Sequence, residues 1–197
     1  MRPCVIALSA AALLLGAVAA AAQQQHGPAT PDRPESAAAV VESPYAGMER
    51  RTVKGLSEQQ ITDLKTGRGM GLALAAELND YPGPSHVLEL ADSLQLSDEQ
   101  RTKTKALLDA MKAETIPVGE QLVAEESTLD RLFANKTITR ASLDAMTTRI
   151  GATQGTLRAA HLRSHLAMRE VLSLTQIGRY AELRGYAADK IHHGQTD

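Results

Sequence analysis

Three side chains that can bind metal ions lie close together near the C-terminus, in the order His161, His165 and Met168. In a helix, residues four and seven apart share a face, so two imidazoles and a thioether would project into one volume. Nitrogen and sulfur ligands of this kind suit a borderline or soft ion such as Cu, Ni or Zn. The alternative is a partly buried polar pair beside a methionine that belongs to the core. The spacing leaves both interpretations open.

The remaining histidines are weaker candidates for metal binding. His86 and Glu89 are three residues apart and would extend the site if their helix packs nearby, or else they are solvated surface residues. His192 and His193 form a terminal pair, which lacks the rigid surroundings that tight metal sites require. Leu162 stands where a zinc protease motif has its general-base glutamate, and the sequence contains no P-loop or GxSxG. We therefore expect no catalytic activity and no required cofactor.

A repeated five-residue pattern, Leu-Ser-x-x-Gln, indicates where three helices begin. In each copy the Ser hydroxyl would accept a hydrogen bond from the Gln backbone N–H, while the Gln side chain accepts one from the Ser N–H. This reciprocal arrangement is a capping box. The residues are Leu56, Ser57 and Gln60, then Leu96, Ser97 and Gln100, then Leu172, Ser173 and Gln176. By themselves these motifs predict helix starts and no chemistry.

The first capping box predicts a helix over residues 57–78. Gly67, Gly69 and Gly71 fall in its middle, where they indicate a bend or the close approach of another helix. A phosphate-binding loop is disfavoured, because the glycine spacing differs and no strand precedes it. After a Tyr-Pro-Gly-Pro break, a short helix is expected over residues 85–94.

Two long helices follow, over residues 98–135 and 141–172. Pro117 lies inside the first and lacks a backbone donor, so a kink or a break into two helices is expected one turn earlier. The second carries an apolar stripe on one face, but Leu162 and Leu166 lie on the opposite face. A helix that is apolar on both sides is usually covered on both sides, either within the fold or in a dimer. The third capping box begins a last, shorter helix.

The chain divides into four segments. Residues 1–22 begin with Arg2 and an Ala- and Leu-rich stretch and end in small residues, which is typical of a cleaved secretory signal peptide. An uncleaved membrane anchor is the alternative, although the stretch is weakly hydrophobic and only marginally long enough. Residues 23–54 are rich in Pro, Ala, Ser and Gln and predict a disordered leader. Residues 55–188 form one all-helical domain, and 189–197 a flexible tail.

Composition excludes several classes of function. The only cysteine, Cys4, lies in the signal segment, so the secreted chain has no thiol for disulfides or catalysis. Removing residues 1–22 also removes Arg2 and changes the formal net charge from −2 to −3, without long runs of either sign. Aromatic residues make up 3% of the chain and tryptophan is absent, which leaves few stacking platforms for bases. We therefore expect no nucleic-acid partner.

Taken together, the three Leu-Ser-x-x-Gln copies, the signal peptide, the cysteine-free domain and the long helices resemble the LTxxQ-motif family of small periplasmic proteins, which includes the Spy and CpxP types. The resemblance covers residues 56–186. It implies an all-α fold with a long antiparallel helical hairpin and shorter flanking helices, dimerising into a curved cradle. It also implies a periplasmic chaperone that binds unfolded or partly folded envelope proteins without ATP, or a partner of a stress-sensing protein.

The same resemblance implies an alternative function. Related heavy-metal resistance and sensor proteins bind Ni, Co, Zn or Cu through a His on the last long helix, a Met four residues later, and a His-x-x-x-His pair on an earlier helix. His161 matches the first of these positions, but His165 stands where the Met would be and Met168 follows a turn later. Residues 57–78 contain no histidine. The sequence thus supports two hypotheses, a chaperone and a periplasmic metal-binding resistance or sensor protein.

Overall fold

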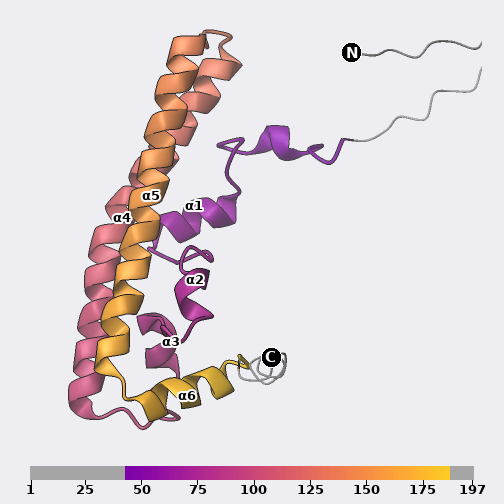
Figure 1. The fold of residues 1–197 in the computed structure, drawn as a ribbon. Coiled ribbons are helices and arrows are strands. Elements are labelled where there is room, and N and C mark those ends of the chain that lie inside the picture. Colours follow the sequence, from indigo (N-terminus) through magenta and orange to yellow (C-terminus); the bar gives the residue numbers. More distant parts are fainter. Residues whose placement is uncertain (1–42, 187–197) are drawn as a thin grey trace, which may run out of the picture. The chain divides into compact units, whose positions relative to one another are not determined.

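The computed structural model describes residues 43–186, and every regular element in this range is a helix. Two long helices, α4 and α5, pack along each other, and the shorter helices flank them (Figure 1). This confirms the predicted all-α fold. The elements are η1 (Met48–Arg50), α1 (Glu58–Lys65), α2 (Leu74–Glu77), α3 (Pro84–Glu89), α4 (Asp98–Ala134), α5 (Arg140–Val171) and α6 (Leu174–Leu183).

The predicted single helix over residues 57–78 is wrong, because the glycine segment divides it into α1 and α2. Gly67 and Gly71 have φ angles of +68° and +78°, a left-handed conformation that ends an α-helix and favours glycine. Gly67 also lies against α4, where a Cβ atom would be 2.8 Å from the hydroxyl of Thr115. The close approach expected from the glycines is therefore present. The next helix, α3, ends at Glu89 rather than at residue 94.

The long helices match their predicted limits closely. α4 continues through Pro117 without interruption, so the expected break is absent, while a kink there stays a prediction. α5 begins with a capping box that the sequence pattern did not reveal, in which Thr139 and Ser142 bond reciprocally. Serine stands at the third helical position in place of the usual Glu or Gln, so the sequence lacks the common capping-box pattern here.

The short helices cover one side of the α4–α5 pair. α1 packs on α4, α2 packs on α5, and α3 contacts both, and Figure 1 shows α1, α2, α3 and α6 along the same side. At Gly119 the contact with α1 is so close that a Cβ atom would lie 2.4 Å from the carbonyl oxygen of Leu64. We call this side of the pair the covered face.

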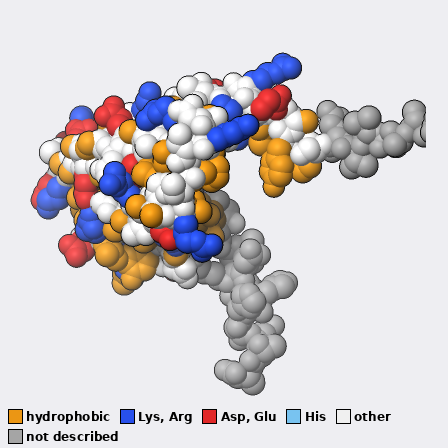
Figure 2. All heavy atoms as spheres, turned by 90° about the horizontal axis from the view of Figure 1, so that it is seen from above, with side chains coloured by type: hydrophobic (Ala, Val, Ile, Leu, Met, Phe, Trp, Pro, Cys, Tyr) orange, Lys and Arg blue, Asp and Glu red, His pale blue; other side chains and the backbone are white. Residues whose placement is uncertain are grey.

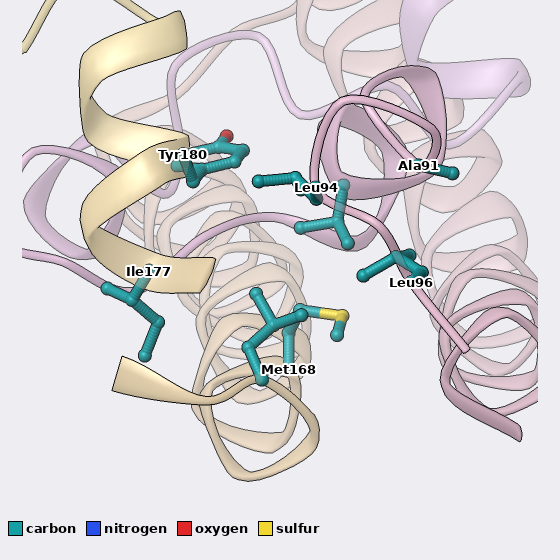
Figure 3. Close-up of a cluster of buried hydrophobic side chains, with 8 residues drawn as sticks. Ala91, Leu94, Leu96, Met168, Ile177 and Tyr180 are labelled. Atoms are coloured by element: carbon teal, nitrogen blue, oxygen red, sulfur yellow. The ribbon is translucent and has the colours of Figure 1, made fainter. Parts of the chain in front are cut away.

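Two hydrophobic clusters fill the covered face. The upper cluster joins α1 to the middle of the helix pair and contains Val53, Leu56, Ile61, Leu64, Leu122, Ile150 and Leu157. Its Val53 lies within the predicted leader, yet is 2% exposed. The lower cluster joins α3 and α6 to the base of the pair and contains Val87, Ala91, Leu94, Leu96, Met168, Leu172, Ile177 and Tyr180 (Figure 3). The leucines that precede the three capping boxes all belong to these clusters.

All three predicted capping boxes form. In each, the Gln backbone N–H donates to the Ser hydroxyl at 3.1–3.2 Å and the Ser N–H donates to the Gln side-chain oxygen at 2.8–3.1 Å. The first box, at Ser57, is exposed, and Gln60 has no side-chain hydrogen bond to another helix within residues 43–186. The second and third boxes differ, because their glutamines also contact each other.

Gln100 and Gln176 form a reciprocal amide pair. The Nε2 group of Gln100 donates to Oε1 of Gln176 at 2.8 Å, and the Nε2 group of Gln176 donates to Oε1 of Gln100 at 3.0 Å. The second donor of Gln100 binds the carbonyl of Val171 at 2.9 Å, and that of Gln176 binds the carbonyl of Leu94 at 3.2 Å. Each amide therefore uses both of its donors and accepts two hydrogen bonds.

We predict that Gln100→Glu destabilises the protein by about 2 kcal/mol, because a carboxylate keeps the capping interaction but cannot donate to Gln176 or Val171. Gln60→Glu is the matched control and should change the free energy of unfolding by less than about 0.5 kcal/mol, since Gln60 is exposed. Urea unfolding of both variants tests this. Equal destabilisation by the two changes would contradict a special role for the pair.

Candidate functional site

The two histidines singled out by their spacing lie together on the covered face of α5. His161 is 2% exposed and His165 is 8% exposed. Nδ1 of His165 is 2.7 Å from the carbonyl oxygen of Tyr81. Because a carbonyl only accepts, Nδ1 carries a proton, and Nε2 of the neutral ring keeps its lone pair. Nε2 of His161 is buried and has no hydrogen-bond partner.

The environment of His161 favours its neutral form. Burial lowers the pKa of its imidazole, and repulsion from His165, when that ring is protonated, lowers it further. A glycine, Gly69, borders the ring, with the position of a Cβ atom 3.8 Å from Nδ1. The pair therefore presents an uncharged, partly unsatisfied imidazole beside one whose orientation is held by the backbone.

The other predicted ligands do not join the pair. Met168 is 0% exposed and belongs to the lower cluster, where Figure 3 shows its sulfur among the side chains of Leu94 and Leu96. His86 is exposed and pairs with Glu89 at 3.1 Å on the surface of α3. The terminal His192 and His193 lie outside the described residues. Within residues 43–186, no group of three or more His, Cys, Asp or Glu side chains is arranged to hold a metal ion.

A buried carboxylate beside the histidines was not predicted. Glu77 of α2 is 8% exposed, and its Oε1 accepts hydrogen bonds from the hydroxyls of Tyr180 and Tyr186, the latter at 3.2 Å. Its Oε2 accepts the backbone N–H of Gly83 at 3.1 Å and lies 3.7 Å from Nδ1 of His165. These contacts connect α2, α5 and α6 around one negative charge.

A cationic group also stabilises this carboxylate. Nε of Arg184, at the end of α6, lies 3.7 Å from Oε1 of Glu77. Burial strongly raises the pKa of Tyr180, and the hydrogen bond to Glu77 adds to the effect, so the phenol remains a donor. In the sequence Glu77 resembles a solvated helix residue, and only the tertiary contacts reveal its role.

The opposite side of the α4–α5 pair is not covered by the short helices. Two grooves, of about 880 and 490 Å³, are lined only by residues of α4, its N-cap and α5, and we call this side the open face. The lower groove is lined by Ser97, Glu99, Gln100, Lys103, Ala106, Leu107, Ala167, Glu170 and Val171. The upper groove is lined by Gln121, Ala124, Glu125, Thr128, Met146 and Arg149. At 100° per residue, Thr128 lies roughly opposite Gly119, which faces α1.

The open face combines apolar and charged groups. Leu166 of α5 is 55% exposed, one turn before Glu170 in the lower groove. Between the grooves, Arg163 of α5 pairs with Glu114 of α4. Seen from above, the molecule likewise shows acidic and basic side chains interspersed with hydrophobic ones (Figure 2). The expectation that α5 is covered on both sides within the fold is therefore wrong at Leu166, and cover by a second copy stays a prediction.

The chain belongs to the heavy-metal resistance family, because the sequence model of that family matches residues 71–179. The match extends from the glycine segment into α6 and includes both candidate histidines. It confirms the resemblance to Spy/CpxP-like proteins, whose family is typically periplasmic. No curated protein and no solved structure matches the chain. None of the helices in residues 43–186 is long and apolar enough to cross a membrane.

We predict that acid destabilises the protein partly through His161. Because its pKa in the folded protein lies below the ordinary 6.5, the unfolded chain binds more protons near and below pH 6.5. Stability is therefore lost as the pH falls through 6.5, with a slope of up to about 1.4 kcal/mol per pH unit from this one group. His161→Gln should flatten the dependence between pH 7 and 5 in urea unfolding. An unchanged slope would assign the acid sensitivity to other groups.

Proposed function

We propose that this protein binds unfolded or partly folded proteins in the periplasm without using nucleotide. The observation that carries the proposal is the open face. Two grooves with mixed apolar and charged linings run along this uncovered side of the helix pair. Extended or partly folded chains expose both apolar and charged side chains, and such a surface can bind many of them weakly. A second copy of the chain, forming the expected homodimer, would add a further open face.

Features near the open face support this proposal. Leu166 is more than half exposed beside the lower groove, where an apolar client side chain would cover it. From residue 126 to residue 145, around the hairpin end, no residue is buried, so both helices remain accessible there. The balance of charges offers no strong attraction for a polyanion. As part of the same proposal we expect a cleaved signal peptide, no catalytic activity, and no nucleic-acid partner. A stress-sensing protein is the alternative partner.

Aggregation of an unrelated denatured protein tests the proposal. The purified chain should suppress aggregation without nucleotide, and Leu166→Asp should raise the concentration needed by about fivefold, since losing one partly buried leucine contact costs on the order of 1 kcal/mol. Leu74→Asp is the matched control, because Leu74 of α2 is similarly exposed, at 53%, but outside the open face. Equal effects of the two variants, or no suppression at several-fold excess, would contradict the proposal.

A second candidate function is metal binding in resistance or sensing. It is favoured by the unpartnered Nε2 of buried His161 and by the fixed ring of His165, whose Nδ1 proton leaves Nε2 free. These two imidazoles would hold a Zn, Ni, Co or Cu ion, with Glu77 orienting His165 from 3.7 Å. Met168 does not fit this set, because its sulfur is enclosed in the lower cluster. Remaining ligands would be water or groups outside the described residues.

Calorimetric titration with Zn, Ni, Co and Cu tests this second function. The wild-type chain should bind one ion more tightly than the His161→Ala/His165→Ala variant, and the ion should raise the Tm of the wild type alone. Both proteins retain His192 and His193, so any binding by the tail is common to both. Circular dichroism must first show that the variant is folded. Equal binding by the two proteins would exclude the histidine pair as a metal site.

A further inference from the structure

Glu125 of α4 is a buried carboxylate with one oxygen unused. It is 6% exposed, and its Oε1 accepts a hydrogen bond from Nε2 of Gln121 at 2.9 Å. Its Oε2 is buried and has no hydrogen-bond partner. Buried carboxylates are normally fully bonded or paired with a cation, because leaving the group unsatisfied is costly. The oxygen therefore lacks the donor that its environment requires.

No neighbouring side chain supplies that donor. Gln121 is held in place because its Nε2 also donates to the hydroxyl of Thr153 at 3.2 Å. The hydroxyl of Thr128 donates to the carbonyl of Ala124 at 2.8 Å, so its proton is already used. Arg149, across the groove on α5, forms no ion pair with Glu125 among the described residues and is exposed. A donor from outside this part of the chain would satisfy the oxygen.

The surroundings of Glu125 indicate what kind of donor fits. The carboxylate lines the upper groove of the open face, whose walls include the apolar side chains of Ala124 and Met146. The adjacent Glu126 does not line this groove, since its Oε2 lies against Gly55, where a Cβ atom would be 3.2 Å away. A cation with an aliphatic stem would satisfy the carboxylate and contact the apolar walls at once. A metal ion fits poorly, since no group of three acidic or histidine ligands occurs in residues 43–186.

We propose that Glu125 binds the ammonium group of a lysine side chain in a polypeptide that lies along the open face. Lysine fits better than arginine, because Gln121 already bonds one carboxylate oxygen and leaves only the other without a partner, whereas a guanidinium fork engages both oxygens. The inference rests on the proposed function and adds a preference to it. Clients with a lysine next to apolar residues would be favoured over purely apolar ones.

Fluorescence anisotropy with two labelled peptides tests this preference. The peptides are extended and apolar, and differ only in carrying lysine or acetyl-lysine at the central position. The full chain should bind the lysine peptide about tenfold more tightly, as expected for a buried charge contact. Glu125→Gln should abolish the difference, whereas Glu120→Gln, an exposed change on the same helix, should preserve it. Equal affinities for the wild type, or a preference that survives in Glu125→Gln, would overturn the proposal.

A second measurement separates the lysine site from client binding in general. The methyl NMR signal of Met146, assigned with Met146→Leu, should move on addition of n-butylammonium but not of n-butanol, and the shift should vanish in Glu125→Gln. If this response occurs but neither peptide binds, the groove accepts free amines only and the lysine docking proposal fails together with the chaperone. If peptides bind without a lysine preference and n-butylammonium has no effect, the lysine site is wrong while client binding stands.

Discussion

The reciprocal amide pair of Gln100 and Gln176 fixes the junction on which the rest of the fold depends. It joins the start of α4 to the start of α6, and its outer donors bind carbonyls at the end of α5 and before α4. Glutamate could complete each capping box alone, but only an amide can both accept from its own helix and donate to the other. The second and third copies of the motif thus both require glutamine, because each of the two amides donates a hydrogen bond to the other.

Local features of the fold were predictable, and contacts between distant residues were not. Capping boxes at Ser57, Ser97 and Ser173 depend on four adjacent residues, so their sequences sufficed. The division of the first helix depends on the left-handed conformation of Gly67, which also lies close against Thr115 of α4. The amide pair and the burial of Glu77 arise from residues more than seventy positions apart. No periodicity in the sequence signals either one.

The candidate site was predicted in part, for the same reason. Helical spacing correctly placed His161 and His165 on one face of α5. It could not show that Met168, one turn further on, enters a hydrophobic cluster formed with α3 and α6. Glu77 and Glu125 look alike in the sequence, yet the first accepts several hydrogen bonds and the second keeps one oxygen unused. The histidine pair lies on the covered face and Glu125 lines a groove of the open face. The two candidate functions therefore use opposite faces of the helix pair and need not compete.

The hairpin end of α4 and α5 is a part of the fold whose length can change. From residue 126 to residue 145 no residue is buried. Leu129 still packs against the upper cluster and Asp130 pairs with Lys54 at 3.6 Å, but beyond them the hairpin end is held by contacts between the two helices and by the caps at its turn. Amide hydrogens there should exchange through local opening, well below the free energy that protects the base. Insertions or deletions of matched helical turns would change the reach of the hairpin without disturbing the junction. Length is thus a property of this fold that can change independently of its stability at the base.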